Sequence, residues 1–138
     1  FLAAHPMVSR VGHPLMPDHP SHALAQQLLK GGARGAGSVF SFDIKGSRTQ
    51  GRAFIEALKI FSHLANVGDS KSLVIHPAST THFRMSDEAL AQAGIGAGTI
   101  RLSVGLEDAD DLIDDLKRAL KAAEKAGEKL TKPSQGAA

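Results

Sequence analysis

The strongest constraint on the fold is the strict alternation of apolar and polar residues over residues 99–104. Successive side chains of an extended strand point to opposite faces, so Ile100, Leu102 and Val104 share one face and the polar residues between them share the other. The segment therefore predicts a strand that is buried on one side. Arg101 is expected on its polar face.

Amphipathic helices accompany this alternation. Residues 38–44 predict a second alternating strand, the apolar stripe of residues 47–64 predicts a long helix, and residues 107–126 predict a terminal helix. Helices that are apolar on one side need one face of a sheet to cover. The sequence therefore predicts the α+β class, as a two-layer sandwich whose mainly antiparallel sheet is covered by helices. The remaining expected elements are a helix tail before Pro6, strands at 8–11, 65–67 and 72–75, and helices at 18–31 and 86–93.

The length of the chain suits one domain. Of the 138 residues, we expect residues 1–126 to form this domain. Residues 127–138 are polar and contain Pro133, so we expect a disordered tail there. The sequence begins at Phe1 without an initiator methionine, and we interpret the chain as a piece of a longer protein.

Composition argues against several classes of partner. The chain carries 16 Lys+Arg against 14 Asp+Glu, a surplus of +2, and its basic residues are scattered, so we expect no nucleic-acid binding. No apolar stretch approaches the roughly 20 residues that cross a membrane, so we expect no membrane partner. The sequence contains no cysteine, which excludes disulfides and thiolate catalysis and fits a reducing compartment such as the cytoplasm.

The histidines do not have the spacing of a metal site. His76 and His82 lack the i,i+4 helical spacing of a metal pair, and His19 and His22 lack a third ligand nearby. We therefore expect no bound metal. Arg101 is a stronger candidate for binding, because a guanidinium can hold a carboxylate with two hydrogen bonds. The local pattern alone favours a surface residue or a structural ion pair for this arginine.

Two long motifs change this balance. Residues 62–82 and 98–108, with the shorter motifs 42–46 and 19–22, closely resemble the C-terminal domain of O-acetylhomoserine sulfhydrylases, which belong to the pyridoxal-phosphate-dependent Cys/Met metabolism family. The resemblance covers residues 1–122. It implies the fold of the small C-terminal domain of the aspartate-aminotransferase-like enzymes that use pyridoxal 5′-phosphate.

The same resemblance assigns the site residues. It implies that Arg101 anchors the α-carboxylate of the amino-acid substrate and that Asn66 lies on the substrate side of the cofactor. Thr81 and His82 border the same cleft, and we expect a supporting role for them. Asn66 stands in an Asn-Val-Gly sequence, which resembles the sulfhydrylases more than the lyases.

The resemblance also implies what this chain lacks. In the family, the large N-terminal domain supplies the Schiff-base lysine, the aspartate that pairs with the pyridine nitrogen and the phosphate-binding loop, and none of these motifs occurs here. We therefore expect no catalytic residue and no bound cofactor in this chain alone, and we expect it to be inactive by itself. The full-length enzyme is expected to bind pyridoxal 5′-phosphate and a small-molecule substrate and to form a homotetramer.

The resemblance implies a transferase of methionine biosynthesis. In the implied reaction, O-acetyl-L-homoserine and sulfide, or methanethiol, give L-homocysteine, or methionine, and acetate. Two alternatives stay open at this point. One is the same domain of a cystathionine γ-synthase or γ-lyase, and the other is a stand-alone α+β interaction module without catalysis.

Overall fold

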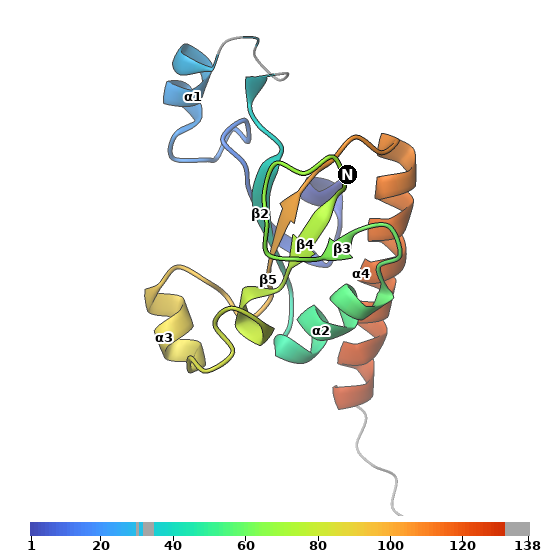
Figure 1. The fold of residues 1–138 in the computed structure, drawn as a ribbon. Helices are drawn as coiled ribbons and strands as arrows, with labels where there is room; N and C mark the ends of the chain where they lie inside the picture. The colour runs from blue at the N-terminus through green and yellow to red at the C-terminus, as the bar shows by residue number, and fades with distance from the viewer. Residues whose placement is uncertain (30, 32–34, 132–138) are drawn as a thin grey trace, which may run out of the picture.

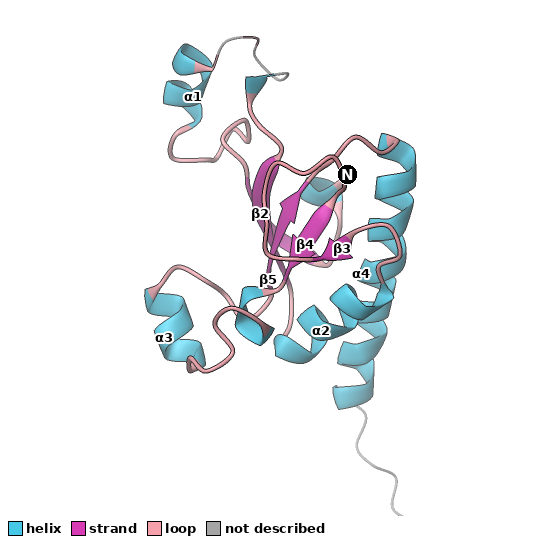
Figure 2. Cartoon of the chain, in the orientation of Figure 1, coloured by secondary structure: helices cyan, strands magenta, loops and turns pink. Residues whose placement is uncertain are grey.

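A single mixed sheet organises the chain. The computed structural model describes residues 1–29, 31 and 35–131. Its five strands lie in the order β1-β2-β5-β4-β3 (Figure 2). The strands are β1 (Val8–Gly12), β2 (Val39–Ile44), β3 (Ser62–His63), β4 (Leu73–Ile75) and β5 (Thr99–Ser103). The helical segments are η1 (Leu2–Ala4), α1 (His22–Leu28), α2 (Arg48–Ala57), η3 (Pro77–Ser79), α3 (Asp87–Gln92) and α4 (Ala109–Thr131).

The pairing of the strands confirms the expected α+β class and the mainly antiparallel sheet. β5 lies at the centre and pairs antiparallel with β2 on one side and with β4 on the other. The β1–β2 pair is also antiparallel, and only the short β3–β4 pair is parallel. Helices α2 and α4 lie together on one side of the sheet, whereas α1 and α3 lie apart from them (Figure 1). The two layers are therefore the sheet and the α2–α4 pair.

The core lies between the sheet and these two helices. Phe42 of β2 pairs in register with Ile100 of β5, and both are buried. The ring of Phe54, from α2, meets the ring of Phe42 edge to face, with 5.7 Å between centroids. Leu120, on the apolar stripe of α4, belongs to the same cluster. Full burial of a side chain of this size stabilises a fold by about 1.5–3 kcal/mol, so the predicted apolar faces supply the driving force for this layer.

Helix α2 is shorter than expected. The helix predicted over residues 47–64 ends at Ala57, and the two-residue strand β3 occupies part of the remainder. The cause lies on α4, where the buried carboxylate of Asp115 accepts hydrogen bonds from the amides of Lys59 and Ile60 at 2.9 and 2.8 Å. These amides would otherwise continue the helix. A contact between residues about 55 positions apart thus ends α2.

The segment after β3 also differs from expectation. Residues 65–67, predicted as a strand, belong to the loop of residues 64–72, here called the β3–β4 loop, which is exposed up to residue 71. Because β3 and β4 are parallel, the chain must return across the sheet between them, and this loop makes that return. Helix α1 begins at His22 rather than at residue 18.

Helix α4 continues past the expected domain boundary at residue 126. Gly127 remains helical because α4 packs against α2 there. The approach is close, since a Cβ at Gly127 would lie 2.8 Å from Gln50 Nε2. Of the expected tail 127–138, residues 127–131 are helical and residues 132–138 lie outside the described residues. No helix in the described part of the chain is long and apolar enough to cross a membrane.

Candidate functional site

Arg101 lies at the centre of the sheet on the face away from α2 and α4. It stands between Ser41 of β2 and Ile75 of β4 in the strand register, and its neighbours in sequence point into the core. Its Nη2 donates a hydrogen bond to the backbone carbonyl of Asn66 at 3.1 Å. Arginine carries five N–H donors. Within the described residues only this one is engaged, so the guanidinium has donors available for a carboxylate.

Asn66 belongs to the β3–β4 loop, which passes over the outer face of β5. Its carbonyl oxygen accepts from Arg101, while its side-chain oxygen accepts from the amide of Val67 at 2.9 Å. The structure therefore brings together the two residues that the resemblance assigned to substrate binding. It also shows that the main chain of Asn66, rather than its amide group, contacts the arginine.

The far end of this loop is fixed by a carboxylate that sequence reasoning missed. Glu107, in the turn between β5 and α4, accepts from the amide of Ser72 through Oε1 at 2.8 Å and from its hydroxyl through Oε2 at 2.7 Å. The hydroxyl of Ser72 in turn accepts from the amide of Gly105 at 2.9 Å. Glu107 stands in a motif quoted for the resemblance, but its partner is 35 residues away, so no local spacing could have revealed the contact.

Thr81 and His82 lie on the segment that follows β4. Thr81 Oγ1 and His82 Nδ1 are hydrogen-bonded at 2.7 Å, and the amide of His82 donates to the carbonyl of Pro77 at 2.9 Å. Among the described residues, no hydrogen bond joins either of them to Arg101 or Asn66. The structure thus pairs the two supporting candidates with each other and not with the arginine.

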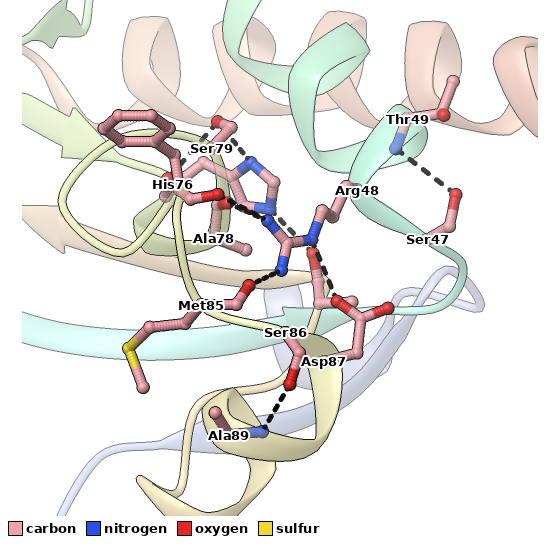
Figure 3. Close-up of polar contacts among 12 residues, drawn as sticks. Ser47, Arg48, Thr49, His76, Ala78, Ser79, Met85, Ser86, Asp87 and Ala89 are labelled. Atoms are coloured by element: carbon pink, nitrogen blue, oxygen red, sulfur yellow. Dashed lines mark hydrogen bonds and ion pairs between the residues drawn. The ribbon is translucent and has the colours of Figure 1, made fainter.

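Arg48 anchors this segment to the start of α2 (Figure 3). Its Nε forms an ion pair with Asp87 Oδ1 at 2.9 Å, and its Nη atoms donate to the carbonyls of Ala78 at 2.7 Å and Met85 at 2.6 Å. The bonds thus fasten a stretch of chain that begins just after β4 and ends in α3. Sequence reasoning took Arg48 only as part of a helix, because its partners are 30 to 39 residues away.

His76 is fully buried beneath the same segment. Its Nε2 donates to the carbonyl of Ala97 at 2.7 Å, which leaves Nδ1 to accept from the hydroxyl of Ser79 at 2.8 Å. The ring packs directly on Gly51 of α2, where a Cβ would lie 2.3 Å from Nε2. Burial lowers the pKa of His76, and the nearby positive charges of Arg48 and other groups act in the same direction. The ring is therefore held neutral as a structural hydrogen-bond centre.

The lysines and the metal-ligating side chains of the described residues show what this chain could hold. The seven lysines at positions 45, 59, 71, 117, 121, 125 and 129 are all exposed. A lysine that forms a Schiff base normally lies in an enclosed or cationic site that lowers its pKa. The described lysines therefore do not fit the cofactor that the resemblance implies. No group of three His, Asp or Glu side chains in residues 1–29, 31 and 35–131 could hold a metal ion.

Comparison with known proteins gives consistent matches. The family model described as Cys/Met metabolism PLP-dependent enzyme matches residues 1–121. The chain is 48% identical over 112 residues to O-acetyl-L-homoserine sulfhydrylase 1 of Thermus thermophilus, covering 81% of this chain and 26% of the relative. It is 46% identical over 113 residues to the O-acetyl-L-homoserine sulfhydrylase of Corynebacterium glutamicum, covering 82% and 25%. L-methionine gamma-lyase of Pseudomonas putida is 42% identical over 113 residues, covering 82% and 27%.

Solved structures with the same fold agree. A Campylobacter jejuni structure, named O-acetylhomoserine (thiol)-lyase and carrying N′-pyridoxyl-lysine-5′-monophosphate, superposes with a TM-score of 0.77 at 42% identity, covering 87% of this chain and 28% of that one. Cystathionine gamma synthase of Xanthomonas oryzae, in complex with cystathionine, gives 0.76 at 42% identity, covering 91% and 31%. The chain spans only about a quarter of the length of the relatives it matches. The match over residues 1–121 shows that the chain belongs to the family of Cys/Met metabolism enzymes that depend on pyridoxal phosphate.

Proposed function

We propose that this chain is the substrate-carboxylate-binding part of a transferase that depends on pyridoxal 5′-phosphate. The proposed reaction converts O-acetyl-L-homoserine and sulfide, or methanethiol, to L-homocysteine, or methionine, and acetate. The observation that carries the proposal is Arg101, which stands on the outer face of the central strand with the Asn66 carbonyl against its Nη2. The identity of 48% and 46% to two O-acetyl-L-homoserine sulfhydrylases supports the choice of reaction.

In this proposal Arg101 binds and orients the substrate. A guanidinium matches a carboxylate with two parallel hydrogen bonds, and a strand paired on both sides holds its backbone in place. Fixing the α-carboxylate restricts the orientation of the rest of the amino acid, which is a positioning contribution to catalysis. Asn66 orients the guanidinium, and Thr81 with His82 supports the neighbouring wall of the cleft. The cofactor-holding residues belong to the remainder of the protein.

Replacement of Arg101 tests the proposal in the complete enzyme. We expect Arg101→Ala to raise the KM for O-acetyl-L-homoserine by about 10-fold or more, because a charge-assisted contact is lost, and to lower kcat as well. Arg101→Lys keeps the charge but loses the two-pronged geometry, so its KM should lie between those of the wild type and the alanine variant. Arg52→Ala, an exposed arginine on α2, is the control. Steady-state kinetics that are unchanged in Arg101→Ala would refute the assignment.

A cystathionine γ-synthase or γ-lyase is the second candidate. The similarity to cystathionine gamma synthase of Xanthomonas oryzae and to L-methionine gamma-lyase of Pseudomonas putida favours it, since both are 42% identical to this chain. The sulfur-containing substrate, sulfide or L-cysteine, distinguishes the two candidates. A sulfhydrylase forms L-homocysteine from O-acetyl-L-homoserine when sulfide is supplied, whereas a synthase forms cystathionine when L-cysteine is supplied.

The proposal extends to assembly and location. We propose that the complete enzyme is a cytoplasmic homotetramer and that this chain is inactive without the rest of the protein. Light scattering of the purified complete enzyme would measure the number of subunits. The intact mass of the natural protein separates this reading from a stand-alone α+β module, because the module would have the 14.4 kDa mass of this chain.

A further inference from the structure

We propose that Glu107 is a positioning residue for Arg101. Through Ser72 it holds the β3–β4 loop over the sheet, and the Asn66 carbonyl of that loop orients the guanidinium. The inference rests on the proposed function, because it takes Arg101 as the ligand of the substrate carboxylate. It adds a residue that the resemblance did not assign to the site.

The contact between Glu107 and Ser72 uses both oxygens of the carboxylate. Oε1 accepts from the Ser72 amide at 2.8 Å, and Oε2 accepts from the Ser72 hydroxyl at 2.7 Å. Ser72 is fully buried, so both of its donors depend on this single side chain. Burial alone would raise the pKa of Glu107, but the hydrogen bonds from Ser72 and the charge of Lys71 outweigh it and lower the pKa. The carboxylate is therefore ionised at neutral pH, as two-donor binding requires.

The backbone around Glu107 is shaped to receive the loop. The amide of Leu106 donates to the carbonyl of Ser70 at 2.9 Å. At Gly105 a Cβ would lie only 2.3 Å from the Ser70 carbonyl oxygen and 2.7 Å from Glu107 Oε2. The glycine thus lets the loop cross the β5–α4 turn at a distance that any side chain would prevent.

Before Ser70 the loop has few other contacts to hold it. Residues 64–71 are all exposed, and the amide of Lys71 is bonded within the loop, to Asp69 Oδ1 at 3.0 Å. At the base, the Ser62 amide donates to the Ser72 carbonyl at 2.9 Å. Over the sheet, the bond from Arg101 to Asn66 is the contact that reaches β5. The height of the loop above Arg101 therefore depends on how its C-terminal end is fixed, and Glu107 is the side chain that fixes it, together with the backbone bonds at Ser70 and Ser72.

A double-mutant cycle in the complete enzyme tests whether Glu107 acts through Arg101. Glu107→Gln keeps the size of the side chain but places an NH2 group against a donor of Ser72. We expect it to raise the KM for O-acetyl-L-homoserine about 10-fold, with kcat changed less than about 2-fold. In the Arg101→Ala background, the same substitution should leave KM unchanged, because coupled residues are not additive.

Hydrogen exchange gives a readout that does not depend on activity. We expect the hydrogen-bonded amides of the loop, those of Asn66, Val67 and Lys71, to exchange faster in Glu107→Gln and in Ser72→Ala than in the wild type, with the exchange of β2 unchanged. Ser72→Ala keeps the bond from its backbone to Oε1 and is the milder second variant. Glu124→Gln, an exposed glutamate on α4, is the matched control and should change neither exchange nor KM.

The outcomes separate this inference from the proposed function. A KM for Arg101→Ala equal to that of the wild type refutes the function and the inference together. If Arg101→Ala raises KM and Glu107→Gln raises it further by the same factor in that background, only the inference fails. Unchanged exchange of residues 64–71 in both Glu107→Gln and Ser72→Ala also overturns the inference and leaves the function standing.

Discussion

At the scale of single residues, buried polar side chains explain how the stability of this fold is expected to depend on pH. His76 is the clearest case, because its two ring nitrogens are bonded to Ser79 and to the carbonyl of Ala97 in a site with no exposure to solvent. Protonation would place a second donor against a hydroxyl and a positive charge near Arg48 and Arg52. The native structure therefore binds the neutral ring and opposes its protonation.

The sign of the pH dependence follows from this preference. The folded pKa of His76 lies below the ordinary value of 6.5, so between the two values the unfolded chain binds more protons than the folded one. The contribution of neutral His76 is fully present above pH 6.5 and is lost as the pH falls toward the folded pKa. We predict that the free energy of unfolding, from urea titrations, decreases between pH 7 and pH 5. His76→Gln should flatten this slope, while His19→Gln, the control, should keep it; an equal slope in His76→Gln would contradict the prediction.

Asp115 determines where a whole element, helix α2, ends. Its carboxylate has no exposure to solvent and accepts from the amides of Lys59, Ile60 and Phe61, and Arg118 donates to its other side. Burial alone would raise the pKa of Asp115, but these hydrogen bonds outweigh it and lower the pKa. Asp115 thereby ties α4 to the segment that connects the end of α2 with β3.

We predict that Asp115→Ala destabilises the fold by about 3 kcal/mol or more, because it leaves several amides and a guanidinium without their acceptor. The adjacent Asp114 provides the control, since its ion pair with Lys117 is exposed on both sides and such pairs contribute only about 0–1 kcal/mol. Urea denaturation followed by circular dichroism measures both variants. A loss in Asp115→Ala no larger than in Asp114→Asn would show that the turn after α2 does not depend on this carboxylate.

At the scale of elements, the sequence predicted what periodicity can report. The alternation of residues 99–104 and 38–44 identified β5 and β2 and placed Arg101 on the outer face, because these properties depend only on neighbouring residues. The end of α2 and the course of the β3–β4 loop were not predictable in this way. They depend on Asp115 and Glu107, whose partners are 35 to 56 residues away.

The candidate site was likewise predictable only in part. Its residues Arg101 and Asn66 came from motifs that resemble a family, and the structure adds that they meet through the Asn66 carbonyl. Neither the carbonyl contact nor the Glu107–Ser72 contact has a signature in spacing, since each joins segments on different strands and turns. The roles of Thr81 and His82 stay predictions, because their bonds run to each other and to Pro77.

At the scale of the whole molecule, the chain holds one apolar core and, in our proposal, one side of a site. The core between the sheet and the α2–α4 pair is closed by Phe54, Ile100 and Leu120, which are fully buried. The opposite face presents Arg101 beneath an exposed loop. The relatives it matches are about four times as long as the aligned segment, which covers 25 to 28% of their length. The groups that complete the site therefore belong, in our proposal, to the remainder of the protein.

This division predicts how the chain of 138 residues behaves when pyridoxal 5′-phosphate is added to it alone. Because the seven lysines of the described segments are exposed, any reaction with the aldehyde should be weak, unsaturated at one equivalent and reversed by dialysis. The measurement is visible absorbance before and after dialysis, with N-acetyl-lysine methyl ester at the same lysine concentration as the control. If the division that we propose is right, mixing the chain with the separately produced remainder of the protein should generate a band that survives dialysis. A stoichiometric, dialysis-resistant band with the chain alone would show that it holds the cofactor by itself and would overturn the proposed division of the site.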